Sequence, residues 1–134
     1  MRSTKIVTSF IKDNDKLLIL KRSDKVKSMK GLWAGVSGII EKDEEPLERA
    51  IIEIFEEVGI TKDKITLVKS AEEMRVHSPQ YENHEWEIFP FLFEAKNPTI
   101  KLNWENSEFK WINVDELEKY QTVPSLQKVL FNLL

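Results

Sequence analysis

Residues 38–60 constrain the fold of this chain more strongly than any other segment. Pro46 suits the first turn of a helix and Gly59 suits the left-handed position just past a last turn, so the pair predicts a helix over residues 46–58. Apolar residues recur between them at helical spacing and form a stripe made of Leu47, Ile51, Ile54 and Val58. We therefore expect an amphipathic helix that packs one face against a core.

Three glutamates share another face of this predicted helix. Glu53, Glu56 and Glu57 stand at positions i, i+3 and i+4, which brings their side chains together on one side. Like charges at this spacing destabilise an isolated helix by about 0.2–0.5 kcal/mol per pair. A bound divalent cation would offset that repulsion. Each glutamate taken singly is more typical of a solvent-facing surface, and it is their grouping that favours a metal site.

The composition favours an ordinary globular domain. Of the 134 residues, 41% are hydrophobic and 32% are charged, and a chain of this length can bury a sizeable core. We expect one domain spanning residues 1–134. No cysteine is present, which excludes disulfides, thiolate chemistry and cysteine-ligated zinc. The apolar run at residues 6–11 is too short and too interrupted for a signal peptide or a membrane span, so we expect a cytoplasmic protein without a membrane partner.

The charge is distributed unevenly, although the net charge is only −3. Residues 1–37 carry nine basic and three acidic side chains, whereas residues 38–62 carry eight acidic and three basic ones. A basic segment followed by an acidic helix suits a site that holds an anionic ligand together with its metal ions. The overall balance does not favour a nucleic-acid-binding protein.

The remaining pattern predicts a mixed α/β domain with helices on opposite sides of one sheet. Runs with strand-like composition recur at residues 6–11, 17–20, 32–38, 65–68, 86–95 and 109–114. The first two runs flank a polar turn and predict a hairpin, and the run at 86–95 is apolar enough for burial on both faces. We expect a long loop over residues 72–85, a short helix at 115–119 capped by Asp115, and a closing amphipathic helix at 125–134.

Residues 38–60 resemble the Nudix box, which is written G-x5-E-x7-R-E-U-x-E-E-x-G-U, with U for an aliphatic residue. Eight of its nine specified positions match without a gap, including Gly38, Glu44 and the three glutamates of the predicted helix. Weaker similarity extends to the flanks, at Lys21-Arg22, Gly31-Leu-Trp33, Glu108-x-x-Trp111 and Asp115-Glu-Leu117. The resemblance implies a single Nudix domain, built as an α/β/α sandwich with a mixed sheet and a helix packed on each side.

The resemblance also implies an activity. Nudix enzymes hydrolyse a diphosphate linkage in a nucleoside diphosphate derivative or a nucleoside triphosphate, by attack of water on phosphorus with Mg²⁺ or Mn²⁺ bound. It assigns metal binding to the Gly38 carbonyl and to Glu53, Glu56 and Glu57, assigns catalysis to the same glutamates, and gives Glu44 a supporting role. As the base that takes the proton of the water, we expect Glu53 first and Glu108 second.

One position departs from the box. Ile52 stands where the family has an arginine that pairs with the glutamates, and isoleucine cannot form an ion pair. Arg49 lies four residues before Glu53 on the same helical face and can supply part of that charge, whereas its reach to Glu44 is left open by the sequence. Two interpretations therefore stand: a hydrolase, and a Nudix-fold module that binds nucleotides or a protein partner with weak or no hydrolysis.

Other residues are candidates for substrate contact. Lys21 and Arg22 end a predicted strand and could hold phosphates, although solvated charges are as common there. Trp33 could stack on a base, although a tryptophan after Gly-Leu more often packs beneath a loop. In Nudix subgroups a proline or a tyrosine at a set distance after the box marks some substrates, and Pro79 and Tyr81 do not fall at such distances; this argues mildly against ADP-ribose and dinucleoside polyphosphates and leaves oxidised or ordinary nucleoside triphosphates plausible. We expect a small-molecule nucleotide as the partner, and both a monomer and a homodimer fit the sequence.

Overall fold

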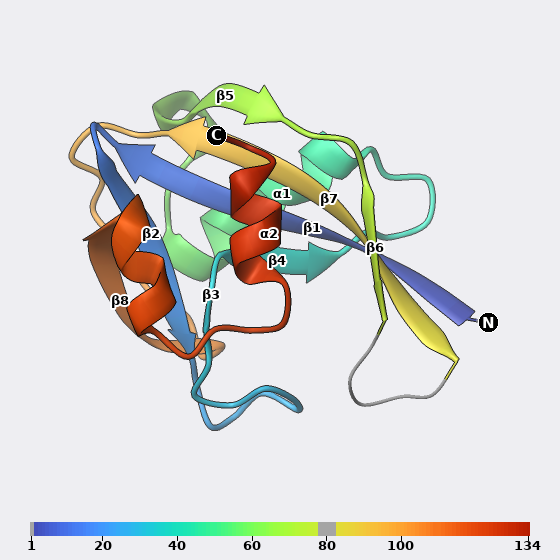
Figure 1. Ribbon diagram of the computed structural model, residues 1–134. Coiled ribbons are helices and arrows are strands. Elements are labelled where there is room, and N and C mark those ends of the chain that lie inside the picture. The colour runs from blue at the N-terminus through green and yellow to red at the C-terminus, as the bar shows by residue number, and fades with distance from the viewer. Residues whose placement is uncertain (1, 78–82) are drawn as a thin grey trace.

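The computed structural model describes residues 2–77 and 83–134, which form one mixed sheet with helices (Figure 1). Pro79 and Tyr81 lie outside the described residues. The strands are β1 (Arg2–Asp13), β2 (Lys16–Arg22), β3 (Trp33–Ala34), β4 (Val36–Ile39), β5 (Thr66–Ser70), β6 (Met74–His77), β7 (His84–Glu94) and β8 (Asn106–Asn113). The helices are α1 (Pro46–Val58) and α2 (Leu126–Phe131), and two short 3₁₀ helices are η1 (Lys62–Lys64) and η2 (Val114–Lys119).

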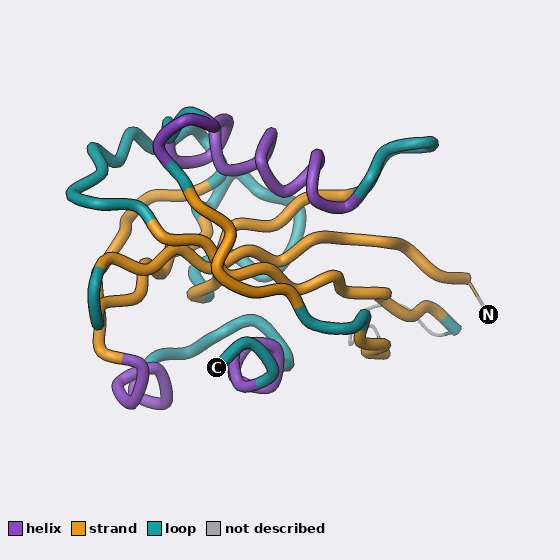
Figure 2. The backbone as a smooth tube through the Cα atoms, turned by 90° about the horizontal axis from the view of Figure 1, so that it is seen from above, coloured by secondary structure: helices purple, strands orange, loops and turns teal. Residues whose placement is uncertain are grey.

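Strand β1 lies at the centre of the sheet. It runs parallel to β7 and antiparallel to β2 and β4. The sheet continues from β2 to β3 and β8, and from β7 to β5 and β6, always by antiparallel pairing. Figure 2 shows α1 on one side of the sheet and α2, beside the C-terminus, on the other. The predicted α/β/α sandwich with a mixed sheet is confirmed.

Two apolar layers hold the helices to the sheet. Because successive side chains of a strand point to opposite faces, β1 contributes Val7 and Ile11 to the layer under α1 and Phe10 to the layer under α2. Helix α1 adds Ala50, Ile54 and Val58 to the first layer, and α2 adds Leu126, Val129 and Leu130 to the second. The strand predicted at 86–95 is confirmed as buried, since β7 contributes to both layers.

Helix α1 begins and ends where the sequence predicts. Pro46 is its first residue, and Gly59 follows it with φ 78° and donates its backbone N–H to the Phe55 carbonyl at 3.0 Å. The predicted apolar stripe is partly wrong, because Leu47 is exposed and Ala50 is buried in its place.

Two other predictions are wrong. Residues 72–85 do not form a loop throughout, because β6 forms from residue 74 and β7 already begins at residue 84. Met74 is buried and pairs with Ile88 of β7. The pairing with β7 makes this polar segment a strand, and the local sequence pattern does not predict that pairing. The short helix near residue 115 is a 3₁₀ helix capped by Asn113, whose N–H donates to Glu116 Oε1 at 2.8 Å. The cap precedes Asp115 because β8 ends at Asn113.

Within the described residues, no helix is long and apolar enough to cross a membrane.

Candidate functional site

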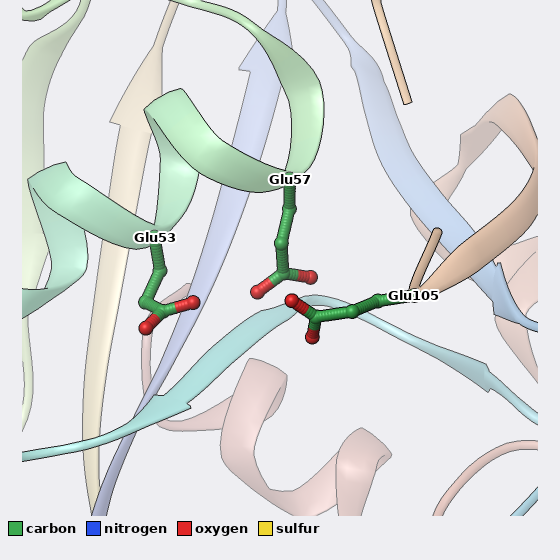
Figure 3. A group of neighbouring side chains, drawn as sticks. All are labelled: Glu53, Glu57 and Glu105. Atoms are coloured by element: carbon green, nitrogen blue, oxygen red, sulfur yellow. The ribbon is translucent and has the colours of Figure 1, made fainter. Parts of the chain in front are cut away.

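Three carboxylates from two separate parts of the chain meet beside the sheet. Glu53 and Glu57 project from α1, and Glu105 comes from the turn that precedes β8. One oxygen of each lies within 4.8 Å of the other two. Figure 3 shows the three carboxylates pointing toward one another. We call Glu53, Glu57 and Glu105 the carboxylate cluster.

Two members of the cluster, Glu53 and Glu57, are buried, and burial shifts their ionisation. Glu57 is only 3% exposed, and burial, together with the charges of Glu105 and Glu53, raises its pKa well above the ordinary value of 4.5. Burial also raises the pKa of Glu53. Asn106 donates its Nδ2–H to Glu57 Oε1 at 3.1 Å, whereas Glu57 Oε2 has no hydrogen-bond partner among the described residues. The cluster therefore favours either a retained proton or a bound cation.

The residues present fit a divalent cation. Carboxylate oxygens are the hard ligands that Mg²⁺ and Mn²⁺ prefer, and a cation would neutralise the charges that burial makes costly. Gly38, on β4, lies directly against Glu53, because a Cβ at this position would overlap the Glu53 side chain. The absence of a side chain at Gly38 thus lets the β4 backbone lie against the Glu53 side chain.

Arg49 reaches Glu53, as the sequence predicts, and also Glu44, which the sequence left open. Its Nε and Nη2 donate to the two oxygens of Glu44 at 2.9 and 2.7 Å, and its Nη1 donates to Glu53 Oε2 at 3.0 Å. These hydrogen bonds raise the pKa of Arg49 and lower the pKa of Glu44. Ile52, where the box has its arginine, is 38% exposed. The ion pair that isoleucine cannot make is therefore made from position 49.

A cavity of about 450 Å³ opens beside the cluster. One part of its wall is charged and polar, formed by Arg22, Glu41, Arg49, Glu53, Glu56 and Glu105. Another part is apolar, formed by Ile6, Val76, Trp86, Ile88, Trp104, Val123, Pro124, Leu126 and Val129. Its size lies within the range of small-molecule sites, which typically combine a largely apolar lining with a few polar groups.

The residues predicted to contact substrate fall in different places. Arg22 lines the cavity, is half-buried, and donates to the Ser28 carbonyl at 3.1 and 3.2 Å; burial lowers its pKa. Lys21 and Glu108 form an exposed ion pair at 3.5 Å and are not part of the cavity wall. Trp33 is buried in the core against Tyr120, with ring centroids 5.3 Å apart.

The predicted glutamates are also only partly brought together. Glu56 is exposed and lines the cavity, but it is not a member of the carboxylate cluster. Glu105 takes that place and was missed by the sequence analysis, as were Asn106 and the cavity tryptophans, Trp86 and Trp104. The one available signal was the polar pair Glu105-Asn106 directly before a predicted strand, which by itself is typical of any turn.

Comparison with known proteins extends over nearly the whole chain. The family model described as the NUDIX domain matches residues 2–133. Dihydroneopterin triphosphate diphosphatase of Haemophilus influenzae is 28% identical, with the match covering 96% of this chain and 87% of that protein.

Solved structures share the fold. The MutT protein of Methanosarcina mazei Go1 superposes with a TM-score of 0.76 at 21% identity, covering 97% of this chain and 91% of that one. An Ap4A hydrolase of C. elegans superposes with a TM-score of 0.75 at 18% identity, covering 98% and 94%.

Proposed function

The chain belongs to the Nudix family and is a Nudix-type pyrophosphohydrolase, and on that premise we propose that it hydrolyses the triphosphate of a flat heterocycle. The substrate class is a nucleoside triphosphate or a pterin triphosphate, and the reaction is attack of water on phosphorus with Mg²⁺ or Mn²⁺ bound. The observation that carries this proposal is the carboxylate cluster beside a cavity that is also lined by apolar and aromatic residues.

We assign metal binding and phosphate binding to different residues of the site. We assign metal binding to Glu53, Glu57 and the Gly38 carbonyl, with Glu56 joining them from the cavity wall. A cation held there would neutralise phosphate charge and lower the pKa of bound water. We assign phosphate binding to Arg22, which lines the cavity.

We assign to Glu105 the role of the general base, which accepts the proton of the attacking water. Arg49 Nη1 already donates to Glu53 Oε2, so that oxygen is occupied and does not accept the proton of a water. Glu108 is paired with Lys21 away from the cavity. Glu105 lines the cavity within the cluster, so its carboxylate can reach a water beside the bound phosphates.

The substrate assignment rests on the cavity and on one relative. Trp86 and Trp104 are among the residues that line the cavity, and aromatic side chains suit stacking on a planar ring. The Haemophilus influenzae relative is named for a pterin triphosphate, which is such a ring joined to three phosphates. The hydrolase is favoured over the binding module because Arg49 supplies the ion pair whose absence at Ile52 had suggested inactivity.

The test is release of pyrophosphate and phosphate from dihydroneopterin triphosphate and the nucleoside triphosphates, with ADP-ribose and a dinucleoside tetraphosphate as comparison substrates. Each is assayed with Mg²⁺, with Mn²⁺ and with chelator. We expect metal-dependent pyrophosphate release from a triphosphate. We expect Glu105→Gln to lower kcat by about 10²–10⁴-fold, the typical contribution of a general base.

Glu108→Gln is the matched control, because this carboxylate lies three residues further along the chain and outside the cavity wall. It should retain wild-type kcat. Release that persists in chelator, or a Glu105→Gln variant as active as Glu108→Gln, would contradict the assignment of metal and base. Release from ADP-ribose in preference to every triphosphate would contradict the substrate class.

A further inference from the structure

We propose that Arg49 is the positioning residue of the metal site, and that it does from one turn earlier what an arginine at position 52 would do. It holds the Glu53 carboxylate in the orientation that binds the cation and thereby sets metal affinity. This inference rests on the proposed metal-dependent function, but it concerns binding of the metal and not the choice of substrate.

The contacts of Arg49 are those of a fixed side chain and not of a surface ion pair. Three of its N–H groups are engaged, two with Glu44 and one with Glu53, at 2.7 to 3.0 Å. The side chains of Arg49, Glu44 and Glu53 are only 14%, 19% and 10% exposed. A two-pronged pair of this kind fixes both the distance and the plane of the guanidinium, which a single contact does not.

Helix geometry explains why position 49 can reach both partners. Glu53 is one turn further along the same face, and helical side chains lean toward the N-terminus, so Glu53 leans back toward Arg49. Arg49 leans in the same direction and reaches Glu44, which precedes the helix. Glu44 is itself held by the backbone N–H of Glu41 at 2.7 Å. The loop before α1, Arg49 and Glu53 thus form one continuous set of hydrogen bonds.

The same geometry explains the isoleucine. Residue 52 precedes Glu53 by one position, which is about 100° around the helix. Ile52 is partly exposed and does not line the cavity. Arg49 already pairs with Glu44 and Glu53, so these ion pairs do not need a charge at position 52. The departure from the box at position 52 and the arginine at position 49 are therefore two parts of one arrangement.

Arg49 affects the site in two ways, through the orientation of the Glu53 carboxylate and through its own positive charge. Arg49 engages Glu53 Oε2, which leaves Oε1 as the oxygen available to a cation. Its positive charge offsets part of the repulsion that the Glu53 carboxylate meets from Glu57 and Glu105. Partners that orient a metal ligand in this way typically contribute 10- to 100-fold in metal affinity.

The test is the affinity of the substrate-free protein for Mn²⁺, measured by calorimetry on wild type, Arg49→Met, Arg49→Lys and the double variant Arg49→Met with Ile52→Arg. We expect Arg49→Met to bind Mn²⁺ 10- to 100-fold more weakly. Arg49→Lys should recover part of the affinity, because it keeps the charge but not the two-pronged geometry. The double variant should recover most of it, because it supplies the guanidinium from position 52.

Arg75→Met is the matched control. Arg75 also pairs with two glutamates, Glu85 and Glu87, but it is 63% exposed and lies on β6 outside the cavity wall. It should bind Mn²⁺ within twofold of wild type. Thermal unfolding of each variant separates lost folding from lost metal affinity, and Arg49→Lys serves as the test variant if Arg49→Met does not fold.

The outcomes separate this inference from the proposed function. Wild-type protein that binds no Mn²⁺ would overturn both. If the wild type binds Mn²⁺ and Arg49→Met binds it with an affinity within twofold of wild type, the positioning role alone is overturned, even if the melting temperature of the variant is lower. Arg49→Lys is judged by the same criterion if Arg49→Met does not fold. A folded double variant as weak as Arg49→Met would overturn the equivalence of positions 49 and 52.

Discussion

Replacing Glu57 by glutamine should stabilise the metal-free protein and abolish its stabilisation by divalent cations. Glu57 is buried, its pKa is raised by burial and by the neighbouring carboxylates, and its Oε2 has no hydrogen-bond partner among the described residues. Glutamine has nearly the same shape and keeps an acceptor for the Asn106 hydrogen bond, but it carries no charge. The substitution therefore removes the electrostatic cost of the site together with its function.

The distances within the cluster set the size of the effect. At 4.8 Å and an effective dielectric constant of about 20, two ionised carboxylates repel each other by about 3.5 kcal/mol. Part of this is already relieved, because the folded protein can retain a proton on Glu57. We therefore expect Glu57→Gln to raise the free energy of unfolding by about 1–3 kcal/mol above neutral pH in chelator. For a domain of this size, the melting temperature should rise by roughly 5–10 °C.

The assay is thermal unfolding followed by circular dichroism, in chelator and with Mn²⁺ at about 100 times its dissociation constant. At that concentration, linkage should stabilise the wild-type protein by about 2.7 kcal/mol, whereas Glu57→Gln should gain little. Mn²⁺ should thus reverse or remove the difference between the two proteins.

The control for this experiment is Glu108→Gln, which neutralises an exposed carboxylate in a surface ion pair. It should change the free energy of unfolding by about 0.5 kcal/mol or less and keep the full response to Mn²⁺. A Glu57→Gln protein that is less stable than wild type in chelator, or one that responds to Mn²⁺ as strongly as wild type, would refute the reasoning.

Three other predictions concern pH and two local contacts. The free energy of unfolding of the metal-free protein should fall as the pH rises above 4.5, because the folded state keeps the Glu57 proton after the unfolded chain has lost it; Glu57→Gln should reduce this slope in a pH series of denaturant unfolding. Asn106→Ala should weaken Mn²⁺ binding about tenfold in calorimetry, because Glu57 Oε1 loses its donor. Gly59→Ala should lower the free energy of unfolding by about 1–2 kcal/mol in thermal unfolding, and by more than Gly31→Ala does. Both glycines have positive φ, but a Cβ at Gly59 would lie 3.1 Å from Lys101 Cβ, whereas a Cβ at Gly31 would meet nothing within 4 Å.

Local spacing was enough to predict α1 and the core of its site. The limits of the helix follow from Pro46 and Gly59, and the common face of Glu53 and Glu57 follows from the helical repeat, neither of which depends on the rest of the chain. The resemblance of residues 38–60 to the Nudix box then predicted the sandwich around them, which the fold confirms. These are short-range properties, and they can be read directly from residue order.

Tertiary structure decided what completes the site. Glu105 joins Glu57 because β8 pairs with β2 and brings the preceding turn to α1, and no spacing in the sequence encodes that approach. For the same reason Trp33 lies in the core while Trp86 lines the cavity, since the two differ in which neighbours cover them and not in residue type. The contact of Arg49 with Glu44 depends on the path of the loop before α1. The sequence alone determined the helix and its charges, and only packing determined which groups those charges meet.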